Sequence, residues 1–519
     1  MNWHRAAVFA ALSLFVAVPP LAAQDVTLTS SDGAVEVSGT LLGFDGEFYR
    51  LETKYGELTV DGSGVSCEGP GCPNLTDYVA ELALSGSATM ADVLLPALIE
   101  GFALRNGWRA ARETVDDRHF DYVLSRGEDG VMMAVFNFRV SNTDEGFADL
   151  LANEADIVLA LREIRPGERQ RAFDAGMGDM TDRNRSKVLA LDAMVPVVAP
   201  ANPIRRISTT DLARIFAGEI LSWADLGGPD APIALHLPEV GSGLAQAVED
   251  RLLRPAGLEL AEGVARHGRN SDLVRAVVTD PFAIGIASFA ETGMARVLPL
   301  TGACGFSLQA NRRSIKTEDY PLVSPMFLYM PARRLPKVAR EFLLYVQSPA
   351  AQIVIRRAGF VDQAPERIAI DTQGDRLANA IATAGPEVPL EELQRMIATL
   401  APLTRLSTSF RFEVGSTRPD AQSRGNIEQL ARAIEIGGFD AERLLFVGFS
   451  DGDGPAEANR AIAQKRAESV RDAVLAAAKT AEAGQVEIGV DAFGEALPMA
   501  CDDSDWGRQV NRRVEVWLR

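Results

Sequence analysis

Apolar and polar residues alternate along positions 25–66, and Asp-Gly pairs at 32–33, 45–46 and 61–62 separate the alternating stretches. Alternation with a period of two is typical of strands that bury one face, and Asp-Gly supplies the positive φ angles that tight hairpins need. We therefore expect a small antiparallel β module over residues 24–75.

The stretch from 79 to 366 combines two patterns. Apolar residues recur at helical spacing over 90–103 and 211–216, whereas the Val-Pro-Val-Val run at 195–198 is typical of a buried strand. Helices and strands that alternate in this way predict an α/β domain.

Residues 367–403 carry two apolar helical stripes, around Leu377 and Leu393, with Pro386 and Pro389 between them. Because proline interrupts a helix, we expect a stiff connector of two helices.

From 404 to 519 the pattern indicates strand, helix, strand, helix and strand, with a strand at 444–449, a long helix at 456–478 and a closing strand at 514–518. The expected fold class is multidomain α/β, in which the antiparallel β module comes first and an α+β domain comes last.

The first 23 residues predict a secretory signal peptide. Arg5 precedes a short apolar run over 6–18, Pro19-Pro20 breaks this run, and Ala22-Ala23 is a small-residue cleavage site. The run is too short to span a bilayer comfortably, which disfavours the alternative of an N-terminal anchor helix. No later stretch approaches 18 apolar residues, so we expect an exported periplasmic protein without an integral membrane segment in the mature chain.

Composition narrows the classes of partner. The chain has 519 residues, of which 47% are hydrophobic and 24% are charged, and this balance excludes a wholly disordered protein. Its 52 basic and 71 acidic residues give a net charge of -19. A chain this acidic repels nucleic acid and anionic lipid, so neither is an expected partner, and any bound anion must be held by a local site.

The four cysteines do not form a dense disulfide framework. Cys67 and Cys72 flank a Gly-Pro-Gly turn, and in an oxidising compartment they are expected to form a local disulfide. Half of a zinc site is the alternative, although no second Cys or His pair lies nearby. Cys304 and Cys501 lie in different predicted domains, and free, buried thiols are one interpretation of them.

No catalytic residue, metal site or cofactor is predicted. The chain has only four His and lacks the His-Glu-x-x-His, Gly-x-Ser-x-Gly and Walker motifs. The Asp-Gly-Asp-Gly sequence at 451–454 lacks the later ligands of a calcium loop. An enzyme is therefore the least favoured class.

The strongest chemical signal lies near the C-terminus. Asp451 follows the strand at 444–449, and Asn459 and Arg466 are seven residues apart on the next helix, so they share one face. A carboxylate and a guanidinium that bracket one spot suit a zwitterion with an ammonium and a carboxylate group. An ordinary surface ion pair without a ligand is the alternative.

These residues resemble the OmpA-like peptidoglycan-binding domain over roughly 404–519. The matching stretches are Gly448-Phe449-Ser450-Asp451, Asn459, Ile462-Ala463, Arg466-Ala467, 494–498, Gly507-Arg508 and Asn511-Arg512-Arg513-Val514-Glu515.

The resemblance implies that Asp451 and Arg466 bind the amino and carboxylate groups of diaminopimelate in the wall peptide. Phe449 and Ser450 replace the His and Thr of the family, changes that affect secondary contacts rather than the charged pair. The further peptidoglycan-binding candidates are Phe449, Ser450, Asn459 and Arg512.

Two loops rich in Gly and hydroxyl side chains precede helices in the central region: Ser85-Gly86-Ser87, followed by Thr89, and Gly241-Ser242-Gly243. Such loops allow backbone N–H groups to approach an anion at a helix N-terminus, although ordinary N-capping is the alternative.

Residues 79–366 resemble the phosphate-type periplasmic substrate-binding proteins. The matching stretches are 155–157, 202–203, 212–218, 222–223, 241–243, 280–285, 320–322 and 358–361. The resemblance implies two α/β lobes that close over a ligand about a hinge.

The ligand stays open at this stage. The Arg and the Thr of the family's loop are replaced by Pro238 and Leu244, and Glu239 would repel an anion. Phosphate, another small anionic solute and a vestigial cleft are the alternatives. The solute-binding candidates are Ser85, Gly86, Ser87, Thr89, Ser141, Arg162, Gly241, Ser242 and Gly243.

Two hypotheses of function follow. The leading one is a non-enzymatic envelope protein, anchored to peptidoglycan by its C-terminal domain, whose central domain binds a small solute. The alternative is a wall-anchored adaptor whose central domain recognises another protein.

Overall fold

The structure is a computed structural model that describes residues 25–75, 78–182, 184–412, 415–439, 442–479 and 486–519. The expected signal peptide lies outside these residues. The chain divides into two compact units, each described here by itself. Unit 1 extends to Ala80 and includes Arg334–Lys337, and unit 2 comprises Glu81–Arg333 and Val338–Arg519.

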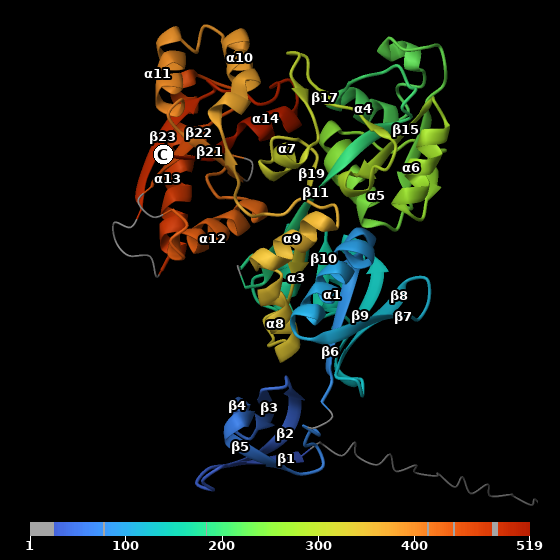
Figure 1. Ribbon diagram of the computed structural model, residues 1–519, viewed down its shortest axis with the longest axis vertical. Helices are drawn as coiled ribbons and strands as arrows, with labels where there is room; N and C mark the ends of the chain where they lie inside the picture. The colour runs from blue at the N-terminus through green and yellow to red at the C-terminus, as the bar shows by residue number, and fades with distance from the viewer. Residues whose placement is uncertain (1–24, 76–77, 183, 413–414, 440–441, 480–485) are drawn as a thin grey trace, which may run out of the picture. The chain divides into compact units, whose positions relative to one another are not determined.

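Unit 1 is a five-stranded antiparallel sheet in the order β4-β3-β2-β1-β5, drawn in blue in Figure 1. Gly33 and Gly46 have positive φ angles of 69° and 89° in the turns that the Asp-Gly pairs predict. A disulfide joins Cys67 and Cys72, as expected. The strands are β1 (Asp25–Ser30), β2 (Glu36–Phe44), β3 (Phe48–Thr53), β4 (Gly56–Asp61) and β5 (Val65–Glu68).

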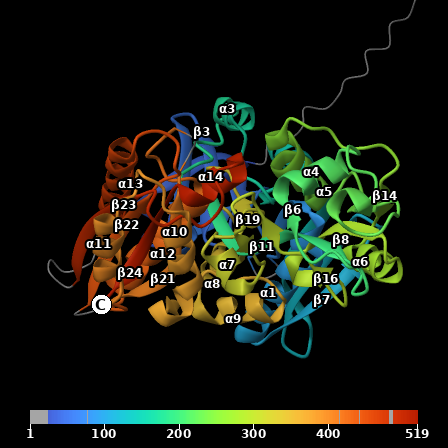
Figure 2. The ribbon, with the colours of Figure 1, turned by 90° about the horizontal axis from the view of Figure 1, so that it is seen from above.

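Unit 2 contains a long mixed sheet in the order β14-β13-β15-β11-β19-β10-β6-β9-β8-β7. The early part of β11 pairs with β19, and its later part, from Met194, pairs with β15. This strand therefore joins two lobes, and it lies beside β19 in both ribbon views (Figures 1 and 2). The strands are β6 (Ala80–Ser87), β7 (Trp108–Thr114), β8 (His119–Arg126), β9 (Val131–Ser141), β10 (Ile157–Ala160), β11 (Ser186–Val198), β13 (Ala234–Pro238), β14 (Ala265–His267), β15 (Ala283–Ser288) and β19 (Val323–Tyr329).

Lobe 1 denotes β6 to β10 with the helices packed on them, and lobe 2 denotes β12 to β18 with theirs. Lobe 1 contains the π-helical turn η2 (Met90–Leu94), α1 (Leu95–Arg105), α2 (Thr143–Leu151), α3 (Pro166–Asp174), α8 (Lys337–Tyr345) and α9 (Pro349–Arg357). Lobe 2 contains α4 (Thr209–Phe216), α5 (Gly243–Val248), the π-helical turn η4 (Glu249–Leu253), α6 (Asn270–Thr279) and α7 (Arg312–Lys316), with the short strands β12 (Ile207–Ser208), β16 (Arg296–Val297), β17 (Leu300–Thr301) and β18 (Ser307–Leu308).

The C-terminal part of unit 2 is a second mixed sheet in the order β20-β21-β24-β22-β23. Alternate residues of β22 enter two cores: Leu444 and Phe446 pack with α12 and α13, whereas Val447 and Phe449 pack with α10 and α11. The elements are β20 (Arg367–Ile368), α10 (Gly374–Thr383), α11 (Leu390–Leu400), β21 (Thr404–Arg411), α12 (Ala421–Glu435), β22 (Arg443–Phe449), α13 (Ala456–Ala477), β23 (Glu487–Gly494), α14 (Asp505–Asn511) and β24 (Arg513–Leu518).

These features confirm the expected multidomain α/β class. None of the helices in the described ranges is both long enough and apolar enough to cross a membrane. The interpretation of Cys304 and Cys501 as free thiols is wrong, because they form a disulfide between lobe 2 and the C-terminal domain. The two cysteines are 197 residues apart, so only the docking of the two domains brings them together.

Candidate binding sites

The end of β22 brings opposite charges together. Asp451 lies just beyond the strand and is almost fully buried, and its Oδ2 is 2.6 Å from Nη1 of Arg512, a residue that follows α14. The sequence placed Asp451 opposite Arg466, whereas the direct ion-pair partner in the structure is Arg512.

Arg466 lies on α13 close to this pair and is only 4% exposed. Its Nε donates to the carbonyl of Ser416 at 3.3 Å, and its guanidinium lies 5.2 Å from the centroid of the Phe412 ring. Burial lowers the pKa of Arg466, the like charge of Arg512 lowers it further, and Asp451 partly opposes both effects. The three charged residues Asp451, Arg466 and Arg512 are called the Asp451 site below. An anionic ligand there would relieve the repulsion between the two guanidinium groups.

The other candidates of this region differ in what they can contact. Asn459 donates from Nδ2 to Glu495 at 2.6 Å. The Ser450 hydroxyl is buried and has no hydrogen-bond partner in the described part of the chain. Phe449 is fully buried and its ring stacks on Phe493, so it acts in the core rather than at an exposed surface.

A cavity of about 210 Å³ reaches Gly452, the residue next to Asp451 in the chain. Gly452, Glu495 and Asp502 line it, and so do residues of α10 and of lobe 2, including Phe306. The Gly452 N–H donates to Asp502 at 2.8 Å. Burial raises the pKa of the Glu495 and Asp502 carboxyl groups, and the negative charge of Asp451 raises both pKa values further. Asp502 was not predicted as a site residue, because only the fold of its loop brings it beside Gly452.

In the central domain, the first candidate loop ends β6. Gly86 has φ +136°, and a Cβ there would lie 2.3 Å from the carbonyl oxygen of Leu159, so only glycine fits. Ser85 donates to Asp149 at 2.5 Å and lies 3.4 Å from the Ser141 hydroxyl. Both hydroxyls therefore belong to an internal cluster.

The Ser87 hydroxyl is fully buried and has no hydrogen-bond partner among the described residues. Thr89 is half-buried and forms no side-chain cap.

The second candidate loop lies against the first. Ser242 caps α5 by accepting from the Ala245 N–H at 3.2 Å, which is the ordinary capping alternative. A Cβ at Gly243 would lie 3.0 Å from the Ser87 Oγ and 3.2 Å from a methyl group of Leu161. Gly241 has open space around it. The loop around Ser87 in lobe 1 is therefore in contact with the loop around Gly243 in lobe 2.

Arg162 is surrounded by acids. Its guanidinium binds Glu168 at 2.6 Å and also pairs with Asp144, and its Nε is 3.7 Å from Asp250 of lobe 2. Burial lowers the pKa of Arg162, but the hydrogen bonds that it donates to Glu168 and Asp144 raise the pKa more. The positive charge of Arg162, one of the predicted solute-binding residues, is therefore already neutralised by carboxylates of the protein.

Comparisons with known proteins agree with this division of the chain. Residues 113–350 match the family model described as the PBP superfamily domain, and residues 411–512 match that of the OmpA family.

Protein SphX of Synechococcus elongatus is 26% identical over 234 residues, which cover 43% of this chain and 67% of the relative. The phosphate-binding protein PstS of Bacillus subtilis is 28% identical over 188 residues, which cover 35% of this chain and 60% of the relative. Outer membrane porin F of Pseudomonas fluorescens is 29% identical over 119 residues, which cover 23% and 35%. The matches thus span only part of each relative.

Both matched families consist of binding domains without enzymatic activity, in agreement with the expectation that the protein is not an enzyme. The chain joins a domain of the PBP superfamily to a domain of the OmpA family in one polypeptide.

Proposed function

We propose that this protein is a periplasmic envelope protein that binds peptidoglycan through the Asp451 site and thereby keeps its PBP domain near the wall. The observation that carries the proposal is the convergence of Asp451 with Arg466 and Arg512 inside the region that matches the OmpA family. Attachment to the wall would raise the local concentration of the PBP domain there.

The ligand that fits is the zwitterionic end of diaminopimelate in the wall peptide. Its ammonium binds Asp451, and its carboxylate binds the two guanidinium groups, which repel each other while no anion lies between them. The ion pair between Asp451 and Arg512 is exchanged for two ion pairs with the ligand, so charge stays balanced at each step.

A pull-down on purified wall sacculi tests this proposal. The variant Asp451→Asn with Arg512→Gln should lose affinity about tenfold or more, since each charge-assisted hydrogen bond contributes about 1.5–3 kcal/mol. Arg443→Ala is the matched control, because it removes a guanidinium from the opposite end of β22. Equal binding by the charge variant and the control would refute the assignment.

The PBP domain has two candidate roles. Binding of phosphate or another small anion is supported by relatives named phosphate-binding protein and by the unpartnered hydroxyl of Ser87. An adaptor role, in which the domain recognises another protein, is supported by the compensated charge of Arg162 and by the contact of Gly243 with the opposite loop.

Titration calorimetry of the full chain with inorganic phosphate separates these two roles. The anion role predicts a saturable heat that Ser87→Val abolishes. The adaptor role predicts no saturable heat with phosphate or with sulfate.

A further inference from the structure

The C-terminal domain is built into lobe 2. The Trp506 side chain, from α14, belongs to the hydrophobic core of that lobe. Its indole Nε1 also donates to the carbonyl of Arg251 in lobe 2 at 2.8 Å. The disulfide between Cys304 and Cys501 adds a covalent bond to the same contact. This attachment combines apolar packing, hydrogen bonding and a covalent link.

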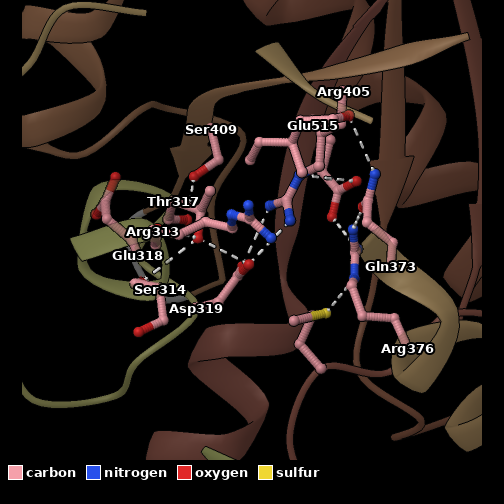
Figure 3. Close-up of polar contacts among 12 residues, drawn as sticks. Arg313, Ser314, Thr317, Glu318, Asp319, Gln373, Arg376, Arg405, Ser409 and Glu515 are labelled. Carbon is pink, nitrogen blue, oxygen red and sulfur yellow. Dashed lines mark hydrogen bonds and ion pairs between the residues drawn. The ribbon is translucent and has the colours of Figure 1, made fainter. Parts of the chain in front are cut away.

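Buried charges strengthen the contact with lobe 2. Asp319, which follows α7, accepts hydrogen bonds from both terminal nitrogens of Arg405 at 2.9 and 3.2 Å (Figure 3). Arg411 lies 3.3 Å from the same carboxylate. Ser409 donates to the carbonyl of Thr317 at 2.5 Å. A carboxylate buried with two guanidinium groups cannot be withdrawn without leaving unpaired charges in the interior.

A second buried carboxylate continues this network. Glu515 lies 3.3 Å from Arg405 and 2.5 Å from Arg376 (Figure 3). It also lies 2.7 Å from Arg513. Burial raises the pKa of Glu515, but the three guanidinium groups lower it more, to about 2. The network therefore stays ionised at neutral pH and fixes β21 and β24 against lobe 2.

The same C-terminal domain also contacts lobe 1. Ala421, at the start of α12, belongs to the hydrophobic core formed by Phe147, Val158 and other residues of that lobe. Arg424 pairs with Glu163 at 2.6 Å. Along the same helix, Gln429 donates to Gln363 at 2.9 Å, beyond α9. A cavity of about 610 Å³ lies between these elements. The helix α12 and lobe 1 therefore touch at separate points around this cavity.

The lobes also meet each other directly. Arg165 of lobe 1 pairs with Asp250 of lobe 2 at 2.7 Å, and the Gly243 loop lies against Ser87 and Leu161. The cleft between the lobes is therefore closed by residues of the protein itself.

We propose that the C-terminal domain holds the two lobes in this single closed arrangement. A rotation that opens the cleft must move one lobe away from the C-terminal domain, because that domain is attached to both. Such a movement separates either Asp319 from its guanidinium groups or Ala421 and Arg424 from lobe 1. The inference does not depend on peptidoglycan binding, since it rests only on contacts inside unit 2.

Distances between two spin labels test the proposal. The labels are attached to cysteines introduced by Glu128→Cys in lobe 1 and Glu262→Cys in lobe 2, two exposed positions. The wild-type chain should give one narrow distance distribution. Release of both attachments should add a second, longer distance. The attachment to lobe 2 is weakened by Cys304→Ser, Cys501→Ser and Asp319→Asn, and the attachment to lobe 1 by Ala421→Asp and Arg424→Ala.

The matched control removes the disulfide of unit 1 and an exposed ion pair, by Cys67→Ser, Cys72→Ser and Arg214→Ala, and should keep the narrow distribution. A released variant that keeps the wild-type distribution would overturn the proposal. Two distances in the unmodified chain would overturn it as well, and this second measurement does not depend on the folding of any variant.

Discussion

The disulfide between Cys304 and Cys501 should contribute far more stability than the disulfide between Cys67 and Cys72. The first closes a loop between residues 197 positions apart, and the second closes one between residues only 5 apart. In the chain-entropy model, these separations correspond to about 5 and about 2 kcal/mol of unfolded-state entropy at 25 °C.

Urea unfolding followed by tryptophan fluorescence measures the contribution of the disulfide between Cys304 and Cys501. Trp108, Trp223, Trp506 and Trp517 all lie in unit 2, and the residues of unit 1 from 25 onward contain no tryptophan. Fluorescence therefore reports the unit that contains the long-range disulfide. Cys304→Ser with Cys501→Ser should shift the transition to lower urea, and Cys67→Ser with Cys72→Ser should leave it in place.

The two variants form a matched pair, since each removes one disulfide and adds two hydroxyl groups. A loss below about 1 kcal/mol in the Cys304 and Cys501 variant, the size of an ordinary point substitution, would refute the reasoning. An equal shift in both variants would refute it as well.

Three further outcomes are expected. Burial raises the pKa of Asp192, a residue of β11, to about 6. The stability that the protonated carboxyl group contributes is therefore lost as pH rises through 6. The variant Asp192→Asn should be about 1–3 kcal/mol more stable than the wild type in thermal melts at pH 8 and equally stable at pH 3. Asp319→Asn removes the carboxylate that Arg405 and Arg411 share and should cost about 3–5 kcal/mol in urea unfolding above pH 5. This effect fades in acid because the folded-state pKa of Asp319 lies below its ordinary value. Gly448→Ala places a Cβ 2.1 Å from the carbonyl of Ala463 and should cost about 1–3 kcal/mol, with weaker binding to sacculi.

Local patterns predicted the elements of the C-terminal domain closely. The helix expected at 456–478 is Ala456–Ala477, and the strand expected at 444–449 is Arg443–Phe449. In both, a single periodicity decides the structure, because each element buries one or two regular faces. The helix expected at 90–103 begins instead with a π-helical turn, which hydrophobic spacing does not reveal.

Contacts between segments that are distant in the chain could not be predicted from the sequence. Arg162 reads as a free cation, but Asp250, from the opposite lobe, lies beside it in the fold. Arg466 reads as the partner of Asp451, whereas the end of α14 brings Arg512 closer. By contrast, alternation along β22 could have assigned Phe449 to the core, because Val447 two residues earlier faces the same side.

The loop at 500–503 serves the Asp451 site and lobe 2 together. Asp502 accepts from the Gly452 N–H at 2.8 Å, Cys501 is bonded to Cys304, and Asp503 accepts from the Ala303 N–H at 2.5 Å. A loop held at both sides loses little freedom when a ligand binds beside it, so less of the binding energy goes into ordering it. The same connection means that a force on the Asp451 site would reach lobe 2 through this loop, in addition to the connector helices. The proposed wall attachment would therefore be mechanically linked to the position of lobe 2.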